Sequence, residues 1–191
     1  DWMLAPLLLL WPMSVTLTYL VAQSIANGPF DRNLGEAVAV LSDYVTEFRF
    51  APARDGAQVP VTLLYRKDLR RDGSAALYQY GYGSYGLSSD PAFSSAVLAL
   101  LDRGLVYAVA QVRGGQELGR RWYDAGRLLQ KQNSFTDFID VTRHLVREGY
   151  ADPARVFARG GSAGGLLMGA IANLAPRDYK ALVAHVPFVD V

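Results

Sequence analysis

The sequence contains no cysteine among its 191 residues, which excludes disulfide bonds, thiolate metal sites and cysteine nucleophiles. It contains only two histidines, His144 and His185, which are too few and too far apart for a histidine-rich metal site. An excess of either charge is also missing, because 19 Lys and Arg balance 18 Asp and Glu to a net charge of +1. We therefore expect no metal, no cofactor and no nucleic-acid partner.

Residues 2–28 contain no charged side chain at all. The length of this stretch suits a membrane span, and Ala-Gln-Ser at residues 22–24 resembles a signal cleavage site. Pro6 and Pro12 interrupt the stretch, and no basic residue precedes it. Strands of a truncated upstream domain, or sequence not native to the protein, are the alternatives. We therefore assign residues 1–43 to a separate apolar segment.

The location expected for the protein is the cytoplasm. It becomes a membrane or the exterior if this apolar stretch is a real targeting segment. Any membrane contact is expected through residues 2–28 alone.

Residues 44–191 have the pattern of a globular domain with a sizeable core. Aromatic and β-branched residues alternate in residues 44–67, which predicts two strands joined by a turn at residues 54–56. Residues 105–112 are almost continuously apolar, as in a strand that is covered on both faces. A buried strand followed by a glycine-rich loop is predicted over residues 77–86.

Helices are predicted between these strands. The first covers residues 91–104, with Pro91 in its first turn. The second covers residues 134–149, with Ser134 as its N-cap and Gly149 at its end. Strands that alternate with helices at short spacing predict an α/β fold with a mostly parallel sheet and flanking helices.

The segment Gly160-Gly161-Ser162-Ala163-Gly164 follows a predicted strand and precedes a predicted helix. It matches the pattern G-x-S-x-G, in which a serine on a sharp strand-to-helix turn exposes its hydroxyl above the sheet. Bulkier neighbours would clash in such a turn, which explains the glycines two residues before and two after the serine. The helix that follows aims its N-terminus at the site, so the N–H of Ala163 can bind an oxyanion. Ser162 is therefore the predicted nucleophile.

A serine hydroxyl is a poor nucleophile without a base, usually a histidine oriented by a carboxylate. In folds that use this turn, the acid and then the histidine follow the serine in the chain. Asp178, His185 and Asp190 follow Ser162 here. His185 lies within an apolar strand, so we interpret it as structural, and His144 precedes the serine within a helix. The sequence thus supplies a nucleophile without a credible base.

Longer stretches resemble the peptidase domain of the prolyl oligopeptidase family, and its oligopeptidase B branch most. They are YGYGSYG (80–86), the run from DRGLVYAVAQVRGG to NSFTDF (102–138), GGSAGGLLMGAIAN (160–173) and VPFVDV (186–191). The resemblance implies an α/β-hydrolase domain over residues 44–191 that is truncated at its C-terminal end. It also implies a seven-bladed β-propeller upstream, of which residues 1–43 would be at most a remnant, without a clear match to it.

The resemblance also implies the activity and the residues of the site. Relatives of this kind cleave short peptides, and oligopeptidase B prefers the carboxyl side of arginine and lysine. Ser162 resembles the family nucleophile, and Tyr82 resembles the side-chain donor of the oxyanion hole, shared with the N–H of Ala163. Tyr85 stands where the family has an aromatic that lines the pocket for the substrate side chain. Asp190 resembles an acid that helps to select a basic side chain next to the cleaved residue.

Three readings of the function follow. The first is a truncated serine oligopeptidase, inactive alone because the triad aspartate and histidine would lie beyond the last residue. The second is an esterase-like α/β-hydrolase, which the family-specific segments RGGQELG and KQNSFTDF disfavour. The third is a vestigial or peptide-binding domain without catalysis, which the missing base favours. Arg113, in RGG, is interpreted as structural.

Overall fold

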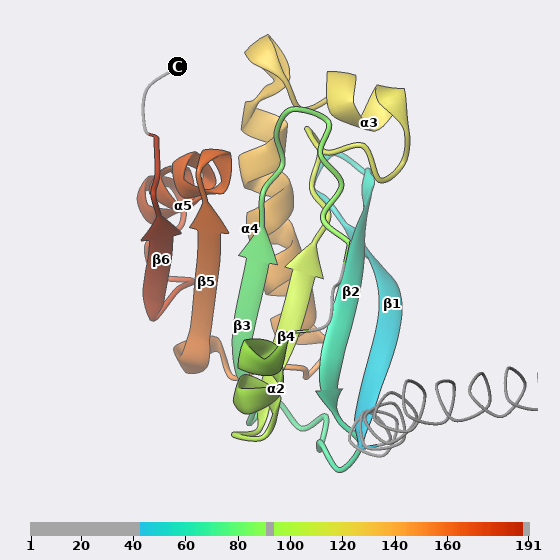
Figure 1. The fold of residues 1–191 in the computed structure, drawn as a ribbon, viewed down its shortest axis with the longest axis vertical. Coiled ribbons are helices and arrows are strands. Elements are labelled where there is room, and N and C mark those ends of the chain that lie inside the picture. The colour runs from blue at the N-terminus through green and yellow to red at the C-terminus, as the bar shows by residue number, and fades with distance from the viewer. Residues whose placement is uncertain (1–42, 91–93, 189–191) are drawn as a thin grey trace, which may run out of the picture. The chain divides into compact units, whose positions relative to one another are not determined.

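The computed structural model describes residues 43–90 and 94–188, and its centre is one six-stranded sheet in the order β1-β2-β4-β3-β5-β6 (Figure 1). The strands are β1 (Tyr44–Pro52), β2 (Gln58–Arg66), β3 (Ala76–Gly81), β4 (Leu105–Ala110), β5 (Val156–Gly161) and β6 (Ala181–His185). Strands β4, β3, β5 and β6 are parallel, whereas β2 pairs antiparallel with both β1 and β4. The prediction of a mostly parallel sheet is confirmed.

The apolar segment, residues 1–43, lies almost wholly outside the described residues, so its nature and its boundary stay predictions. The same holds for a membrane contact through residues 2–28. Among residues 43–90 and 94–188, no helix is both long enough and apolar enough to cross a membrane.

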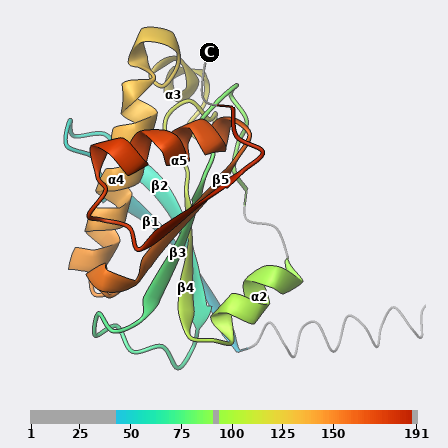
Figure 2. The ribbon, with the colours of Figure 1, turned by 90° about the vertical axis from the view of Figure 1, so that its left-hand side faces the viewer.

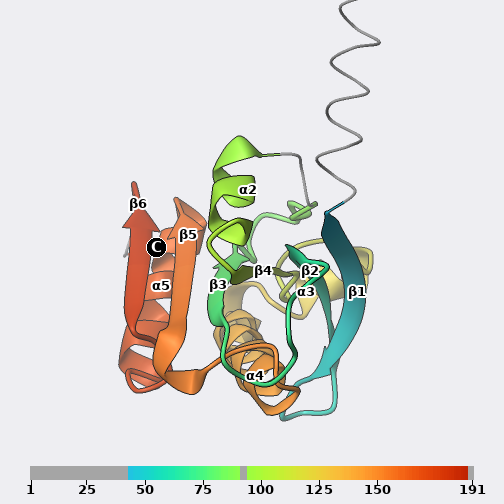
Figure 3. The ribbon, with the colours of Figure 1, turned by 90° about the horizontal axis from the view of Figure 1, so that it is seen from below.

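The described residues form four α-helices, of which α4 and α5 pack on one face of the sheet while α2 lies on the other (Figures 2 and 3). Their bounds are α2 (Ser95–Leu101), α3 (Arg120–Asp124), α4 (Gln132–Arg147) and α5 (Ala163–Leu174), with 3-10 turns at η1 (Leu128–Gln130) and η2 (Pro153–Arg155). Because β3, β4 and β5 run the same way, the loops that follow them meet at one edge of the sheet.

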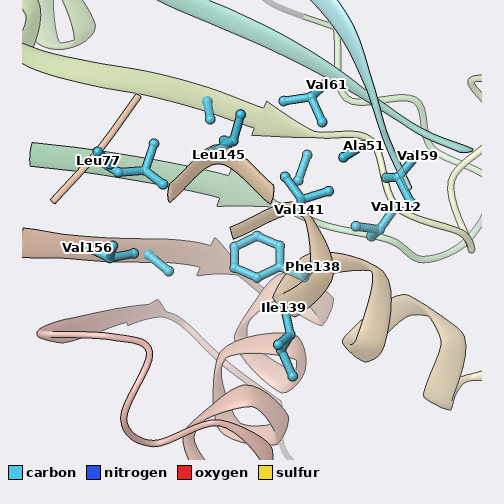
Figure 4. Close-up of a cluster of buried hydrophobic side chains, with 14 of the residues drawn as sticks. Ala51, Val59, Val61, Leu77, Val112, Phe138, Ile139, Val141, Leu145 and Val156 are labelled. Carbon is cyan, nitrogen blue, oxygen red and sulfur yellow. The ribbon is translucent and has the colours of Figure 1, made fainter. Parts of the chain in front are cut away.

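The core lies between α4 and the sheet (Figure 4). Phe138, Val141 and Leu145 of α4 recur at helical spacing and are fully buried. They pack against Leu77 of β3 and Val156 of β5, which are fully buried as well. Fully burying an aliphatic or aromatic side chain contributes about 1.5–3 kcal/mol, so this stripe accounts for the position of α4 on the sheet.

Two predicted helix starts are wrong. Helix α4 begins at Gln132 rather than after Ser134, because the 3-10 turn η1 leads directly into it. Ser134 is buried within the helix, and its hydroxyl donates to the carbonyl of Arg113 at 2.5 Å. Helix α2 begins at Ser95, and Ser94 caps it by accepting the N–H of Val97, whereas Pro91 lies outside the described residues.

Arg113 follows β4 and forms a buried ion pair with Asp137 of α4. Its Nη2 lies 2.5 Å from Oδ1 of Asp137, its Nε lies 2.9 Å from Oδ2, and its backbone N–H donates to the same Oδ2. A third group, Asp55 of the β1–β2 turn, accepts from Nη1 at 2.7 Å. Burial raises the pKa of Asp137, and the guanidinium and the backbone N–H oppose that rise. Arg113 therefore joins three segments, as its structural interpretation requires.

Replacing Arg113 by methionine would leave the carboxylate of Asp137 buried without its partner. We expect the Arg113→Met variant to lose about 3–5 kcal/mol of unfolding free energy, measured by urea denaturation. Arg120→Met is the matched control, because the Arg120–Asp124 pair is 66% and 43% exposed and should contribute little. Equal losses in the two variants would show that the buried pair is not what holds these segments.

Candidate active site

Ser162 occupies the junction between β5, which ends at Gly161, and α5, which begins at Ala163. Its backbone has φ 52° and ψ −114°, a conformation that residues other than glycine rarely adopt. Strain of this kind costs on the order of 1–3 kcal/mol and persists only where the surroundings enforce it. The side chain is exposed, at the end of the sheet where β5 stops. The predicted serine turn between a strand and a helix is therefore present.

The glycines around Ser162 are required by close backbone contacts. A Cβ atom on Gly160 would collide with the carbonyl group of Gly164. A Cβ atom on Gly164 would lie 2.7 Å from the carbonyl oxygen of Gly81, at the end of β3. The turn is thus packed against itself and against the neighbouring strand, and it has no room for side chains at either glycine.

Tyr82 directly follows β3 and lies beside this turn. Its Cα and ring are each within 3.6 Å of the Cβ position of Gly164. Burial, and the nearby Tyr85 and Tyr80, raise the pKa of the Tyr82 phenol, and a hydrogen-bonding interaction with the side chain of Ser162 partly opposes that rise. The phenol therefore stays protonated near neutral pH, and the structure places it close to the serine.

The backbone at the start of α5 offers a second donor. The N–H of Ser162 donates to the carbonyl oxygen of His185 at 2.9 Å, which ties the turn to β6. Ala163 is the first residue of the helix, so its own N–H has no acceptor within the helix. The partial positive charge of a 12-residue helix also lies at this end. The structure thus brings Tyr82, Ser162 and Ala163 together, and their roles as oxyanion donors and nucleophile stay predictions.

A cavity of about 480 Å³ opens at the same edge of the sheet. It is lined by Ser84, Tyr85, Gly114, Tyr123, Gly126, Arg127, Leu128, Lys131, Leu166 and Phe188. Tyr85, predicted to line a substrate pocket, is in this lining and is 61% exposed. Leu166 lies one helical turn after Ser162, which shows how near the cavity is to the serine.

Sequence reasoning missed most of this lining, above all the two cations Arg127 and Lys131. Arg127 pairs with Asp124 at 2.9 Å and lies over the ring of Tyr123. Burial lowers the pKa of Lys131 to about 8. The one sequence signal for Lys131 was its position directly before the amphipathic helix α4. A lysine at such a position is normally on the surface, so the sequence alone did not assign it to the cavity.

Of the remaining candidates, His185 lies beside the Ser162 turn, with its Nδ1 4.0 Å from the Cβ position of Gly161, whereas His144 lies apart from it. Asp190 lies outside the described residues. His185 is exposed at the end of β6, and His144 is half-buried in the last turn of α4, at the opposite edge of the sheet from Ser162. Within residues 43–90 and 94–188, no cluster of His, Asp or Glu could hold a metal ion.

Comparison with known proteins gives matches to peptidases. A family model described as the prolyl oligopeptidase family matches residues 91–191. Dipeptidyl aminopeptidase BI from Pseudoxanthomonas mexicana is 64% identical over 151 residues, which cover 78% of this chain and 21% of that protein. Protease 2 from Moraxella lacunata is 49% identical over 150 residues, which cover 78% of this chain and 22% of that protein. The chain thus spans about a fifth of the length of these relatives.

The structure of oligopeptidase B from Leishmania major superposes with a TM-score of 0.76 at 47% identity, covering 78% of this chain and 21% of that one. The expected α/β-hydrolase fold is confirmed by this match. A second family model, described as the N-terminal region of two-component sensor kinases, matches residues 7–79. The described part of that stretch forms β1, β2 and part of β3, which belong to the same sheet as Ser162.

The contact between Gly164 and β3 predicts opposite effects for one substitution at two places in α5. Gly164→Ala should lower the unfolding free energy by about 1–3 kcal/mol, because the new methyl group meets the carbonyl of Gly81. Gly169→Ala has open space around it and should raise the unfolding free energy by up to about 1 kcal/mol, through helix propensity. Urea denaturation of both variants measures the difference, and equal stabilities would contradict the close packing of the turn.

Proposed function

The chain belongs to the prolyl oligopeptidase family, and on that premise we propose that Ser162 is the nucleophile of a serine-type oligopeptidase acting on short peptides. One observation carries the proposal. The serine is held in a strained turn at the start of α5, with the phenol of Tyr82 beside its side chain. Strain at an exposed serine lowers stability, so its presence beside the Tyr82 phenol fits a catalytic role.

In the proposed reaction, the Ser162 hydroxyl attacks the carbonyl carbon of the scissile bond while a base takes its proton. The negative charge that develops on the carbonyl oxygen is bound by the Tyr82 hydroxyl and the Ala163 N–H, at the positive end of α5. Collapse of this intermediate expels the amine and leaves an acyl group on Ser162, which water then hydrolyses.

The base and its orienting acid are proposed to lie outside these 191 residues. His144 is at the wrong edge of the sheet, and burial lowers its pKa. His185 uses its backbone carbonyl to hold the Ser162 turn, and it belongs to the first strand after the nucleophile. The histidine in this arrangement normally lies on a later loop that reaches back over the serine. We therefore propose that the chain alone has no more than trace activity.

Cleavage after arginine or lysine is the finer part of the proposal, and Asp190 is proposed to help by binding a basic side chain next to the cleaved residue. The cavity beside Ser162 is lined by Tyr85, Tyr123 and leucines, together with the cations Arg127 and Lys131. Cations in a lining do not favour a basic side chain, so a carboxylate must supply the attraction. An esterase would need the same serine turn, but the match to a peptidase family over residues 91–191 favours peptide substrates.

The function is tested by exchange with a relative. Residues 44–191 replace the matching segment of the Pseudoxanthomonas mexicana dipeptidyl aminopeptidase BI, which is 64% identical over 151 residues and supplies the rest of the protein. We expect the chimera to hydrolyse fluorogenic dipeptidyl amides ending in arginine faster than those ending in proline. Ser162→Ala should reduce kcat by about 10⁶-fold.

The 191-residue chain, assayed alone with the same substrates, should show no turnover that depends on Ser162. Turnover by the chain at the rate of the chimera would show that a base exists within it. A chimera whose turnover survives Ser162→Ala would remove the serine from the mechanism, and a preference for proline would overturn the proposed specificity.

Tyr82→Phe in the same chimera removes only the phenolic hydroxyl. Because that hydroxyl is proposed to bind charge that exists only in the transition state, kcat should fall by about 10²–10³-fold with little change in KM. Tyr80→Phe is the matched control, since Tyr80 belongs to β3 and has no such role. Unchanged kcat in the Tyr82 variant would exclude it as an oxyanion donor.

A further inference from the structure

Lys131 contacts the loop that carries Tyr82. It lies between η1 and α4, and its ammonium donates to the carbonyl of Gly83 at 2.5 Å and to the hydroxyl of Ser84 at 2.6 Å. A longer contact reaches the hydroxyl of Ser134 at 3.5 Å. Gly83 and Ser84 are the two residues that follow Tyr82, so the first turn of α4 is tied directly to the proposed oxyanion donor.

The loop that Lys131 holds is strained. Gly83 has φ +66°, and a Cβ there would lie 3.2 Å from the carbonyl oxygen of Arg113. Tyr85 has φ +58°, which is uncommon for a residue with a side chain. A strained loop needs external contacts to keep its conformation, and the two hydrogen bonds from Lys131 supply them.

No carboxylate in the described residues offsets the burial of this ammonium. The groups around it are Tyr85 and Tyr123 across the cavity, Arg127 before η1, and the ring of Phe135, whose centre is 5.8 Å away. Asp137 on its own helix is paired with Arg113. Burying a cation beside neutral acceptors costs stability, and an uncharged side chain such as methionine would fill the site without that cost. The lysine is therefore retained for what its hydrogen bonds hold in place.

We propose that Lys131 is a positioning residue, which fixes the loop after β3 so that the Tyr82 hydroxyl faces the space above Ser162. This inference rests on the proposed role of Tyr82 and deepens it, since it assigns the group that sets the geometry of the oxyanion hole. Lys131 touches neither the serine nor the reacting atoms. Its hydrogen bonds are strongest while the amine is charged.

The test follows the Tyr82 ring rather than catalysis. The 191-residue chain is labelled with ¹³Cζ-tyrosine, and the Tyr82 resonance is assigned by its loss in Tyr82→Phe. In a titration from about pH 6 to 9.5, this resonance should shift with a midpoint near 8, because burial lowers the pKa of Lys131 to that value and raises that of Tyr82 beyond the range. Lys131→Met should move the Tyr82 resonance at pH 7 and abolish the step. Lys131→Arg, which keeps the charge, should abolish the step alone.

Lys67→Met is the matched control, because Lys67 is exposed, and it should leave the step unchanged. A step that persists in Lys131→Met, or a Tyr82 resonance at pH 7 that is the same with and without the lysine, would overturn the proposal. If Lys131→Met does not fold, Lys131→Arg serves as the test. A shift of the Tyr82 resonance near pH 8 that persists in Lys131→Arg would then overturn the proposal. Ser162-dependent turnover does not enter these measurements, so failure here and failure of the proposed function are separate results.

A stability measurement distinguishes positioning from simple support. The folded-state pKa of Lys131 lies below that of a free lysine, so the folded protein releases this proton first as the pH rises. The urea midpoint of the wild type should therefore rise relative to that of Lys131→Met between about pH 8 and 10.5. If the urea midpoint of the wild type instead falls relative to that of Lys131→Met between these pH values, the charged amine stabilises the fold. That result would contradict the proposal.

Discussion

The backbone at the start of α5 passes so close to the end of β3 that no side chain fits between them. This contact, between Gly164 and the carbonyl of Gly81, determines where the two halves of the candidate site lie. Ser162 is two residues before Gly164, and Tyr82 is the residue after Gly81. The separation of Ser162 from Tyr82, the proposed nucleophile and oxyanion donor, is therefore set by a contact of main chain against main chain.

A buried cation, Arg113, and a partly buried one, Lys131, then hold the loops that surround this contact. Arg113 connects the loop after β4 to α4 and to the β1–β2 turn through carboxylates. Lys131 connects the start of α4 to the loop after β3 through neutral oxygens. The charge of Arg113 is neutralised by two carboxylates, whereas Lys131 has only neutral acceptors. The candidate site thus combines a buried ion pair, Arg113–Asp137, with the hydrogen bonds of Lys131, whose strength depends on the protonation of its amine.

Much of this arrangement could be predicted from the sequence, because its causes are local. Glycine spacing predicted the Ser162 turn, and the terminal Gly149 placed the end of α4 correctly to within two residues. The start of α4 was missed because the hydroxyl of Ser134 bonds across the fold to Arg113, whereas a cap was expected from its position alone. The cavity was missed for a similar reason. Its lining comes from five separate segments, and Arg127, Lys131 and Phe188 meet only after the sheet order is known.

The order of the strands has a consequence for how the site forms during folding. β3 pairs with β4 on one side and with β5 on the other, so its second partner arrives only after α2, β4 and α4 have been placed. Parallel pairing between such distant segments requires the closure of a long loop before it gains any contact energy. The strained backbone of Ser162 can be enforced only once β5 and α5 have closed onto β3. We therefore expect the nucleophile turn to be among the last elements to form, and the first to be lost when the chain begins to unfold.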